Sequence, residues 1–380
     1  MLPSDAEAVL DPLLARLRRR PDLETPELQA SDAADRLLLE SVLAEHAAAL
    51  RGAEVVVIGD THGALTLGAL ALGARHVRVH QDSIVAQRAL AENAAALGVG
   101  AFSQHPLDEV AVGDARLVIA RLPRSLDALD AIARAVARGA HPQVALLAAG
   151  MVKHMGLGMN EVLRSSFGRL DVSLARRKAR LLTAREPREV AAAAPVSAFD
   201  AGLGLHVVAV PGAFAGASVD IGARALIAAL DRAPRFGAGA TIIDLACGTG
   251  LIATVLARAN PAARVIASDV SAAAAASARL TAAANGVGVE VVHDDGLGAQ
   301  PDASADLIAL NPPFHVGAAV HTGVAHRLFA EAARALRPGG ELWCVWNSPL
   351  RYAPALQRTV GPTRQLARTP KFTVTASRRR

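Results

Sequence analysis

Short apolar segments alternate with alanine-rich segments along the chain, and this alternation occurs twice. Uninterrupted apolar segments of this length are typical of strands in a parallel sheet whose two faces are covered by helices. In the first half, the expected strands cover residues 54–60, 77–82 and 116–123, with a helix over about 83–97. In the second half, they cover residues 240–245, 264–269, 290–295, 305–310 and 341–346. The pattern therefore predicts an α/β fold built from two copies of one architecture.

Chain length and composition agree with this duplication. The 380 residues are enough for two domains of ordinary size, each with its own core. Hydrophobic residues make up 52% of the chain but aromatic residues only 3%, and cores of Ala, Val and Leu suit a helix-covered sheet. We expect a first domain over residues 1–195 and a second over residues 196–380.

A glycine turn follows the first strand of the second half. Gly248 and Gly250 allow the backbone to approach a ligand closely, and the helix expected over 251–258 presents free N–H groups. Asp269 ends the next strand about 20 residues further on, the spacing at which a carboxylate meets ribose hydroxyls in a doubly wound sheet. Because Gly248-x-Gly250-x-x-Ala253 also fits the dinucleotide fingerprint, a nicotinamide-dependent dehydrogenase stays open on these residues alone.

The segment Asn311-Pro312-Pro313-Phe314 follows the apolar strand at 305–310. Proline has no N–H, so the two prolines leave neighbouring carbonyls free to accept hydrogen bonds, and they also stiffen the loop. The Asn311 side chain and the Pro312 carbonyl supply two acceptors, which match the two N–H bonds of an exocyclic amino group. Phe314 supplies a face on which the ring bearing that amine can stack. The segment therefore predicts a pocket for a planar amine.

Together, the two segments resemble the first and fourth motifs of class I S-adenosylmethionine-dependent methyltransferases, the fourth in the form found where the acceptor is an amino group. The resemblance implies S-adenosyl-L-methionine as the cofactor. The cofactor contacts that it implies are Asp244, Ala246, Gly248, Gly250, Asp269, Asp295 and Asn311. The residues that it implies for catalysis are Asn311, Pro312, Pro313 and Phe314.

The adenine contact depends on the third strand of the second half. That strand ends in Asp294 and Asp295, where the resemblance places an acid that contacts the adenine. Either acid fits, and the Gly-Leu after Asp295 is similar to the family's usual continuation, which favours Asp295. His315 follows Phe314 at the mouth of the predicted pocket. It is a candidate to orient the base or to contact a phosphate, and its role stays open.

Three flanking segments narrow the resemblance further. Residues 219–222 lead into a helix before the glycine turn, residues 337–340 precede a strand, and residues 371–374 open the last strand. This order resembles the ribosomal RNA guanine-N2 methyltransferase family, which includes the small-subunit methyltransferase C and large-subunit methyltransferase G types. The resemblance implies two tandem Rossmann-like class I methyltransferase domains, of which the N-terminal one is degenerate.

The first half fits such a degenerate copy. Thr61-His62-Gly63 stands where the glycine turn would be, and Arg121 stands at the position of Asn311. A guanidinium is only a donor and cannot accept a hydrogen bond from an amine. This half should therefore not perform the same chemistry.

Basic segments favour an RNA partner. Residues 16–20 and 176–180 are rich in arginine, and the net charge of the chain is +5. The resemblance implies ribosomal RNA or a ribosomal subunit as the substrate, with the first domain positioning the RNA. Residues 151–155 and 176–180 are also similar to the segment that connects the two domains in that family.

The predicted reaction is methyl transfer to the exocyclic amino group of a guanine in ribosomal RNA. Accepting both N–H bonds would turn the amine lone pair out of conjugation, so orientation supplies most of the rate. Alternatives are methylation of a glutamine amide in a protein, methylation of a small molecule and, as a different class, a non-catalytic RNA-binding or assembly protein. Residues 347–352 depart from the family's usual sequence, so the target nucleotide and the ribosomal subunit stay open.

Cysteine and histidine usage predicts neither a disulfide framework nor a metal site. The two cysteines and twelve histidines show no zinc spacing. Cys247 lies inside the glycine turn, where a small side chain is needed, and a nucleophilic role is its less favoured alternative. No apolar segment approaches the roughly 20 residues of a membrane helix, so we expect a cytoplasmic protein without a membrane partner. The oligomeric state is unknown from the sequence.

Overall fold

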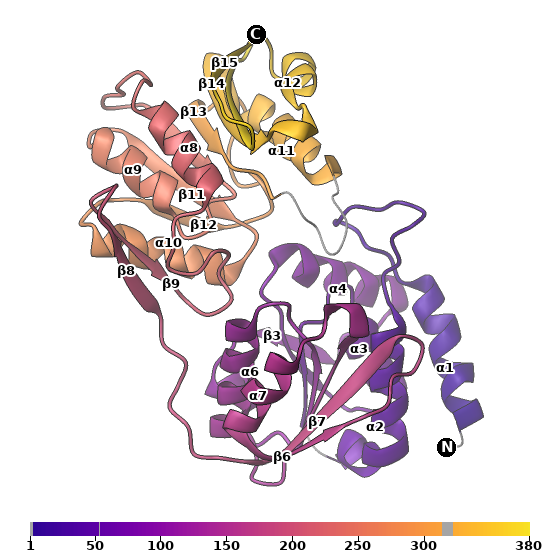
Figure 1. The fold of residues 1–380 in the computed structure, drawn as a ribbon. Coiled ribbons are helices and arrows are strands. Elements are labelled where there is room, and N and C mark those ends of the chain that lie inside the picture. The colour runs from indigo at the N-terminus through magenta and orange to yellow at the C-terminus, as the bar shows by residue number, and fades with distance from the viewer. Residues whose placement is uncertain (1–2, 53, 314–321) are drawn as a thin grey trace. The chain divides into compact units, whose positions relative to one another are not determined.

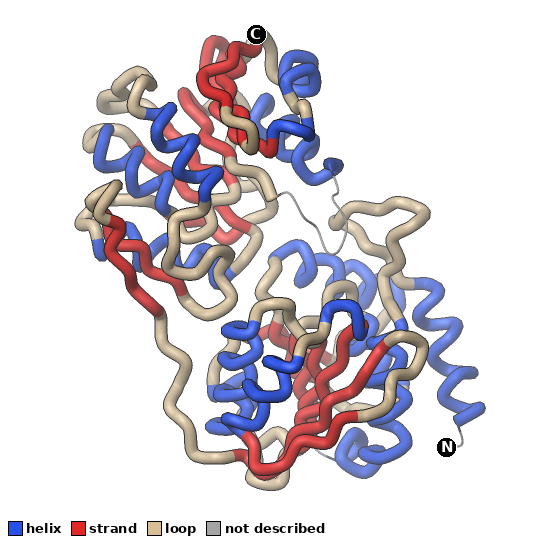
Figure 2. The backbone as a smooth tube through the Cα atoms, viewed as in Figure 1, coloured by secondary structure: helices blue, strands red, loops and turns tan. Residues whose placement is uncertain are grey.

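The computed structural model describes residues 3–52, 54–313 and 322–380. The chain divides into two compact units, Met1–Ala194 and Pro195–Arg380. Each unit contains a sheet with helices on its faces (Figure 1 and Figure 2). Within the described residues, no helix is both long and apolar enough to cross a membrane.

The first unit is a single mixed sheet with its helices. Its described strands are β1 Val55–Ile58, β2 Val77–His80, β3 Phe102–His105, β4 Leu117–Arg121, β5 Ala145–Met151, β6 Phe167–Val172 and β7 Ala179–Pro187. Its helices are α1 Pro3–Arg16, α2 Ala33–Gly52, α3 Ala64–Ala71, α4 Ile84–Leu97, α5 Glu109–Val112, α6 Leu126–Gly139 and α7 Leu157–Ser166, with a short 3₁₀ turn η1 Val152–His154. The strand order is β3-β2-β1-β4-β5-β7-β6, in which the strands from β3 to β5 are parallel and β7 is antiparallel to its neighbours.

The second unit has a sheet of the same design and an additional hairpin. The hairpin is β8 Val196–Asp200 and β9 Leu205–Ala209. The sheet contains β10 Thr241–Leu245, β11 Arg264–Asp269, β12 Glu290–His293, β13 Ala305–Leu310, β14 Leu336–Asn347, β15 Thr363–Arg368 and β16 Phe372–Arg378. The helices are α8 Ile221–Leu230, α9 Leu251–Ala259, α10 Ala272–Ala284, α11 Thr322–Ala335 and α12 Ala353–Thr359, with a short 3₁₀ turn η2 Ser348–Leu350.

The second sheet repeats the topology of the first strand by strand. Its order is β12-β11-β10-β13-β14-β16-β15, which becomes the order of the first sheet when β10 is matched to β1 and each later strand to its counterpart. In both sheets the next-to-last strand in this order is antiparallel to its two neighbours. The prediction of an α/β fold in two tandem copies is confirmed.

The repetition extends to single hydrogen bonds at the turns. The Val152 N–H donates to the Lys178 carbonyl at 2.8 Å, and the Ser348 N–H donates to the Lys371 carbonyl at 2.9 Å, each joining the turn after the fifth strand to the final hairpin. Residues 151–155 therefore lie at the end of β5 and in η1, and residues 176–180 lie in the β6–β7 turn and the start of β7, all within the first unit. The prediction that they connect the domains is wrong, because the segment between β6 and β7 is a hairpin turn that the sequence alone does not separate from a linker.

Both faces of the second sheet are buried. Ile242 belongs to the apolar cluster that contains α8 and α9, whereas its neighbour Ile243 belongs to the cluster that contains α11. Trp343 and Trp346 on β14 are divided between the same two clusters. Burial on two faces explains why the strands appear in the sequence as uninterrupted apolar segments.

The carboxyl ends of the parallel strands lie at one edge of each sheet, which we call the carboxyl edge of that unit. In the second unit, β12 ends at His293, two residues earlier than predicted. Asp294 and Asp295 therefore lie in the loop at the carboxyl edge rather than within the strand. Ligands of open α/β sheets bind at this edge, so the polar residues there are the natural candidates for a site.

Candidate active site

The turn after β10 has an unusual backbone. Ala246, Gly248 and Gly250 have positive φ angles of 59°, 53° and 73°. Successive residues that alternate in this way direct their N–H groups toward a common concavity suited to polar ligands. A Cβ atom at Gly250 would lie 2.6 Å from the Cβ of Ala278, whereas one at Gly248 would meet no heavy atom within 4 Å. Gly250 therefore permits helix packing, and Gly248 faces open space.

Asp269 fixes this turn from the neighbouring strand. One oxygen of its carboxylate accepts the Gly248 N–H at 2.9 Å, and the other accepts the Ser271 N–H at 2.9 Å. Asp269 therefore holds the turn through one of its carboxylate oxygens and Ser271 through the other. The structure thus brings the predicted glycine turn and the predicted acid into direct contact.

Asp244 and Cys247 are buried beneath the turn. Asp244 Oδ2 accepts the Ala253 N–H at 2.8 Å, at the start of α9, and its Oδ1 has no partner among the described residues. Burial raises the pKa of Asp244 to about 8, which the Ala253 N–H opposes and the charge of Asp269 reinforces. Burial also raises the pKa of the Cys247 thiol well above its usual value, with Asp269 and Asp244 adding to the shift. A thiol in this environment is a poor nucleophile.

The two acids after β12 make different contacts. Asp294 closes its own loop, because its carboxylate accepts the N–H of Asp295 at 2.8 Å and of Ala299 at 2.7 Å. Asp295 pairs through Oδ2 with Arg327 at 2.6 Å, while its buried Oδ1 has no partner in the described part of the chain. The geometry favours Asp295 over Asp294 as the acid that contacts a ligand.

Asn311 directly follows β13 and is held by Asp220. The Asn311 Nδ2 donates to Asp220 Oδ2 at 3.1 Å, and the same oxygen accepts the Ala223 N–H at the start of α8. Asn311 Oδ1 is buried without a partner among the described residues. Pro312 is buried and Pro313 exposed. Two further residues of the prediction, Phe314 and His315, lie outside the described residues.

Unpartnered acceptors gather at the carboxyl edge of the second unit. Within the described residues of this unit, the buried side-chain oxygens without a partner belong to Asp244, Asp295, Asn311, Asn347 and Thr375. Four of these five are on, or within two residues after, β10, β12, β13 and β14. An unsatisfied buried acceptor costs about 1–3 kcal/mol. Four such oxygens at one edge fit a ligand that brings N–H and O–H donors, as an adenosine and an amine would. Asn347 was not predicted as a site residue, because residues 347–352 depart from the family's usual sequence.

Known proteins share the features of both units. Residues 204–376 match the family model "Methyltransferase small domain", and residues 10–188 match "RLMG N-terminal domain". The chain is similar to the ribosomal RNA large subunit methyltransferase G of Streptomyces avermitilis, with 36% identity over 375 residues that cover 94% of this chain and 95% of that protein. The chain belongs to the ribosomal RNA large subunit methyltransferase G family.

Other members and a solved structure agree. The protein of the same description from Pseudomonas entomophila is 35% identical over 370 residues, covering 96% of this chain and 97% of that one. The T. thermophilus 16S rRNA N2 G1207 methyltransferase (RsmC), solved with AdoMet and guanosine, is 25% identical with a TM-score of 0.76, covering 94% and 97% of the two chains. The family that the sequence motifs indicate, and S-adenosyl-L-methionine as its cofactor, are confirmed.

In this methyltransferase G family member, an ion pair takes the place of the amine acceptor in the first unit. Arg121, the last residue of β4, stands at the register position that Asn311 has after β13. Its guanidinium contacts both carboxylate oxygens of Asp32 at 2.5 and 2.9 Å. It also donates to Asp35 at 3.0 Å. Asp32 precedes α2 as Asp220 precedes α8. The first unit therefore keeps the acid and fills the acceptor position with a cation.

The cofactor position of the first unit is also changed. Gln81 stands at the register position of Asp269 and donates to the Asp60 carbonyl at 3.0 Å. His62, in the remnant of the glycine turn, contacts the Ala30 carbonyl at 3.2 Å and Asp22 at 3.3 Å. A segment of the chain's own N-terminal region thus lies against the turn of the first unit that corresponds to the turn at Gly248 in the second unit. Gly63 keeps a positive φ of 93°, so the helix start is retained.

Replacing Arg121 with methionine should destabilise the protein without affecting cofactor binding. Asp35 is nearly buried, and burial raises its pKa to about 6, which Arg121 opposes and Asp32 reinforces. Removing one partner of such a pair costs about 2–3 kcal/mol when part of it is exposed. Because the folded-state pKa of Asp35 is raised, ionising it destabilises the fold as pH rises from about 4 toward 6. The decrease in the free energy of unfolding caused by Arg121→Met should therefore be larger at pH 8 than at pH 5. Urea unfolding at the two pH values measures it.

Asp35→Asn added to Arg121→Met is the control. It should recover part of the lost free energy of unfolding and remove the additional loss at pH 8. Equal stability of wild type and Arg121→Met at both pH values would show that the ion pair contributes nothing.

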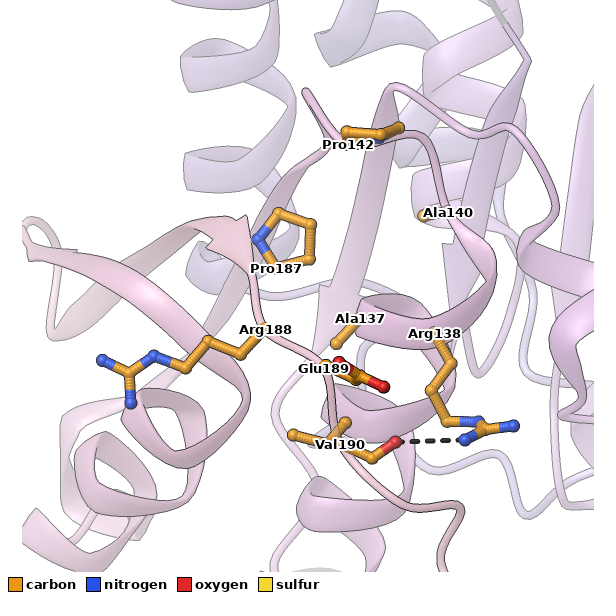
Figure 3. Close-up of a pocket in the computed structure, with 8 residues that line it drawn as sticks. All are labelled: Ala137, Arg138, Ala140, Pro142, Pro187, Arg188, Glu189 and Val190. Atoms are coloured by element: carbon orange, nitrogen blue, oxygen red, sulfur yellow. Dashed lines mark hydrogen bonds between the residues drawn. The ribbon is translucent and has the colours of Figure 1, made fainter.

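The hollow shown in Figure 3 lies away from these residues. It belongs to the first unit, measures about 400 Å³ and is bordered by the carboxyl end of α6 and by residues 187–190. Arg138 donates there to the Val190 carbonyl at 3.0 Å. The end of α6 lies at the edge of the sheet opposite the carboxyl edge, so the hollow is unrelated to the ligand positions of this fold.

Proposed function

We propose that the second unit methylates the exocyclic amino group of a guanine in ribosomal RNA, using S-adenosyl-L-methionine. The observation that carries this proposal is the buried, unpartnered Oδ1 of Asn311 at the end of β13. An acceptor fixed in this way fits the N–H of a conjugated amine, and membership in the methyltransferase G family supplies the substrate class. The large ribosomal subunit is the subunit named for the relatives.

The carboxyl edge of the second unit fits the cofactor. Gly248 leaves room for a ligand, and the N–H groups of the turn converge on it. When bound, S-adenosyl-L-methionine would supply an electrophilic methyl group. The residues that would hold it are Asp244, Ala246, Gly248, Gly250, Asp269 and Asp295, whereas Asn311, the seventh residue of the predicted set, would face mainly the amine. Asp269 would accept from the ribose hydroxyls and Asp295 from the adenine amino group through its unpartnered oxygen.

Asn311 and Pro312 would orient the amine. The lone pair of a guanine amino group is delocalised into the ring, which makes the nitrogen a weak nucleophile. Hydrogen bonds from both N–H groups to Asn311 Oδ1 and to the Pro312 carbonyl would favour the tetrahedral nitrogen of the transition state. No general base is needed, because the alkylated nitrogen is acidic enough to release its proton to water. The base would reach the site from an unpaired or extruded nucleotide.

Nucleoside mass spectrometry of ribosomal RNA from a deletion strain tests the proposal. We expect N2-methylguanosine to be lost at one position of the large-subunit RNA and restored by the wild-type chain. Loss of N2-methylguanosine from the small-subunit RNA instead would assign the substrate to the small subunit. If the RNA is unchanged and a methyl group is instead missing from a protein glutamine or from a small molecule, the proposal is wrong and that alternative is the function.

For the first unit, residues 1–195, we propose a role in positioning the RNA, whereas residues 196–380 carry the catalysis. Its carboxyl edge carries the cations of the β6–β7 turn and of η1. Arg176 and Arg177 pair with Glu40 at 3.5 Å, which leaves them partly neutralised. Lys153 and Lys178 are exposed and, within the described residues, make no ion pair, and the bond from Val152 to Lys178 brings their segments together. These two lysines are the best candidates for phosphate contacts.

Neutralising both lysines, in Lys153→Gln/Lys178→Gln, should weaken RNA binding and flatten its salt dependence. The expected change in the slope of log K against log salt is roughly one unit per lost phosphate contact. Fluorescence anisotropy with an RNA fragment at several salt concentrations measures it. Arg75→Gln/Arg116→Gln, which removes the same charge from the opposite edge of the unit, is the control and should leave the slope unchanged. Equal slopes for the two variants would contradict the positioning role.

A further inference from the structure

We propose that Asp220 and Gly222 are positioning residues that fix the amide orientation of Asn311 and keep its acceptor oxygen accessible. The inference rests on the proposed function, because it concerns the same amine pocket. Both residues belong to the flanking segment 219–222 at the start of α8, outside the glycine turn and the segment at Asn311. Asp220 and Asn311 are separated by 91 positions in the sequence.

Asp220 determines which end of the Asn311 amide faces the pocket. An asparagine side chain is nearly symmetric in shape and can place either its oxygen or its NH₂ group toward a ligand. An ionised carboxylate only accepts hydrogen bonds, so the NH₂ group must face Asp220, and it does so at 3.1 Å. The oxygen is then directed away from Asp220, buried and without a partner among the described residues. Turned over, the amide would present N–H groups to an amine that also has only N–H groups to donate.

Asp220 is itself held rigidly. It is the N-cap of α8, and the oxygen that meets Asn311 also accepts the Ala223 N–H at 3.1 Å. The N-cap position restricts the Asp220 side chain, because its oxygen must remain over the first turn of the helix. The orientation of Asn311 is therefore tied to a helix end rather than to a loop.

Gly222 provides the space next to the acceptor. A Cβ atom at this position would lie 3.1 Å from Asn311 Oδ1 and 2.9 Å from Asp220 Oδ2. On its third side it would lie 3.3 Å from the Phe372 ring. Gly222 is inside a helix, where alanine is preferred on conformational grounds. A glycine at this point leaves the surroundings of the acceptor oxygen open.

The first unit provides an internal comparison. There the acid is retained as Asp32, which caps α2 through the Ala34 N–H at 2.8 Å. The amide is replaced by Arg121, and Ala34, which is buried, stands where Gly222 would be. The copy that lost its acceptor thus also lost the glycine. This joint change agrees with a glycine that serves the acceptor oxygen rather than the packing of the helix.

Three variants of the full chain test the inference. Asp220→Asn keeps an N-cap but lets the amide of Asn311 turn over, so kcat should fall by about tenfold or more while cofactor affinity and the unfolding midpoint change little. Gly222→Ala should lower kcat to a similar extent while cofactor affinity changes little, because the added Cβ crowds Asn311 Oδ1 and Asp220 Oδ2. In the exchanged pair Asp220→Asn/Asn311→Asp, a carboxylate again faces the amine and an NH₂ group again holds it, so kcat should rise above that of Asp220→Asn.

Asp108→Asn is the matched control, because Asp108 caps α5 in the first unit through the Ala111 N–H at 2.8 Å. It should behave as wild type. Wild-type kcat in Asp220→Asn, or no recovery in a folded exchanged pair, would overturn the orienting role, and wild-type kcat in Gly222→Ala would overturn the spacing role. If Asp220→Asn fails to fold, the exchanged pair and Gly222→Ala decide. The wild-type product tests the proposed function, whereas the ratio of variant to wild-type kcat, on whichever amine the wild type methylates, tests this inference.

Discussion

Replacing Asn311 with alanine should lower the rate of methyl transfer by about 100-fold or more while leaving cofactor affinity within a few-fold of wild type. The variant removes the acceptor that faces the amine and leaves the glycine turn and Asp269 in place. Loss of one preorganised polar group at a reacting centre costs about 3 kcal/mol or more, which corresponds to a roughly 100-fold lower kcat. Single-turnover transfer of a labelled methyl group to RNA measures the rate, and calorimetry measures the affinity.

The control for this variant is Asn160→Ala on α7, which removes the same amide from the first unit. It should leave both quantities unchanged. Near wild-type turnover in Asn311→Ala would show that the segment after β13 has a structural role and that the acceptor lies elsewhere. A loss of cofactor binding as large as the loss of rate would assign Asn311 to the donor side of the site.

One S-adenosyl-L-methionine should bind per chain, and Asp269→Ala should remove that binding. Asp269 secures the turn at Gly248 and Ser271, and in the proposed function it would accept from the ribose hydroxyls. Hydrogen bonds to charged groups contribute about 1.5–3 kcal/mol each, so losing two lowers affinity by roughly 100-fold or more. Gln81 stands at the equivalent position of the first unit, and a neutral amide already bonded to Asp60 cannot replace the acid.

Calorimetry on the full chain gives both the stoichiometry and the effect of the substitution. Asp82→Ala, which removes an acid next to Gln81, should leave affinity and stoichiometry as in wild type. Two sites per wild-type chain, or one tight site surviving in Asp269→Ala, would mean that the first unit has kept a working cofactor site. The contacts of His62 with Asp22 and Ala30 argue for the opposite outcome.

The sequence was sufficient for features that depend on neighbours along the chain. The strand pattern, the glycine turn and the segment at Asn311 are each local, and the spacing from Gly248 to Asp269 reflects one strand–helix–strand unit. The partner of Asn311 was not predictable, because Asp220 reaches it only through the packing of α8 against the sheet. The sequence favoured Asp295 over Asp294 only through the Gly-Leu that follows it, and the side-chain directions that separate the two acids depend on the folded loop. Phe314 and His315 remain predictions.

The ion pair of Arg121 also restricts which substitutions could restore an active site in the first unit. Restoring asparagine at Arg121 alone would leave Asp35 with its carboxylate nearly buried and the nearest cation gone. Neutralising Asp35 first would leave a half-buried guanidinium with only Asp32. Restoring the asparagine therefore lowers stability unless Asp35 is neutralised as well, and Gln81 would still have to change before activity could return. The loss of this site is therefore hard to reverse: it can proceed one substitution at a time, whereas its restoration requires several substitutions together.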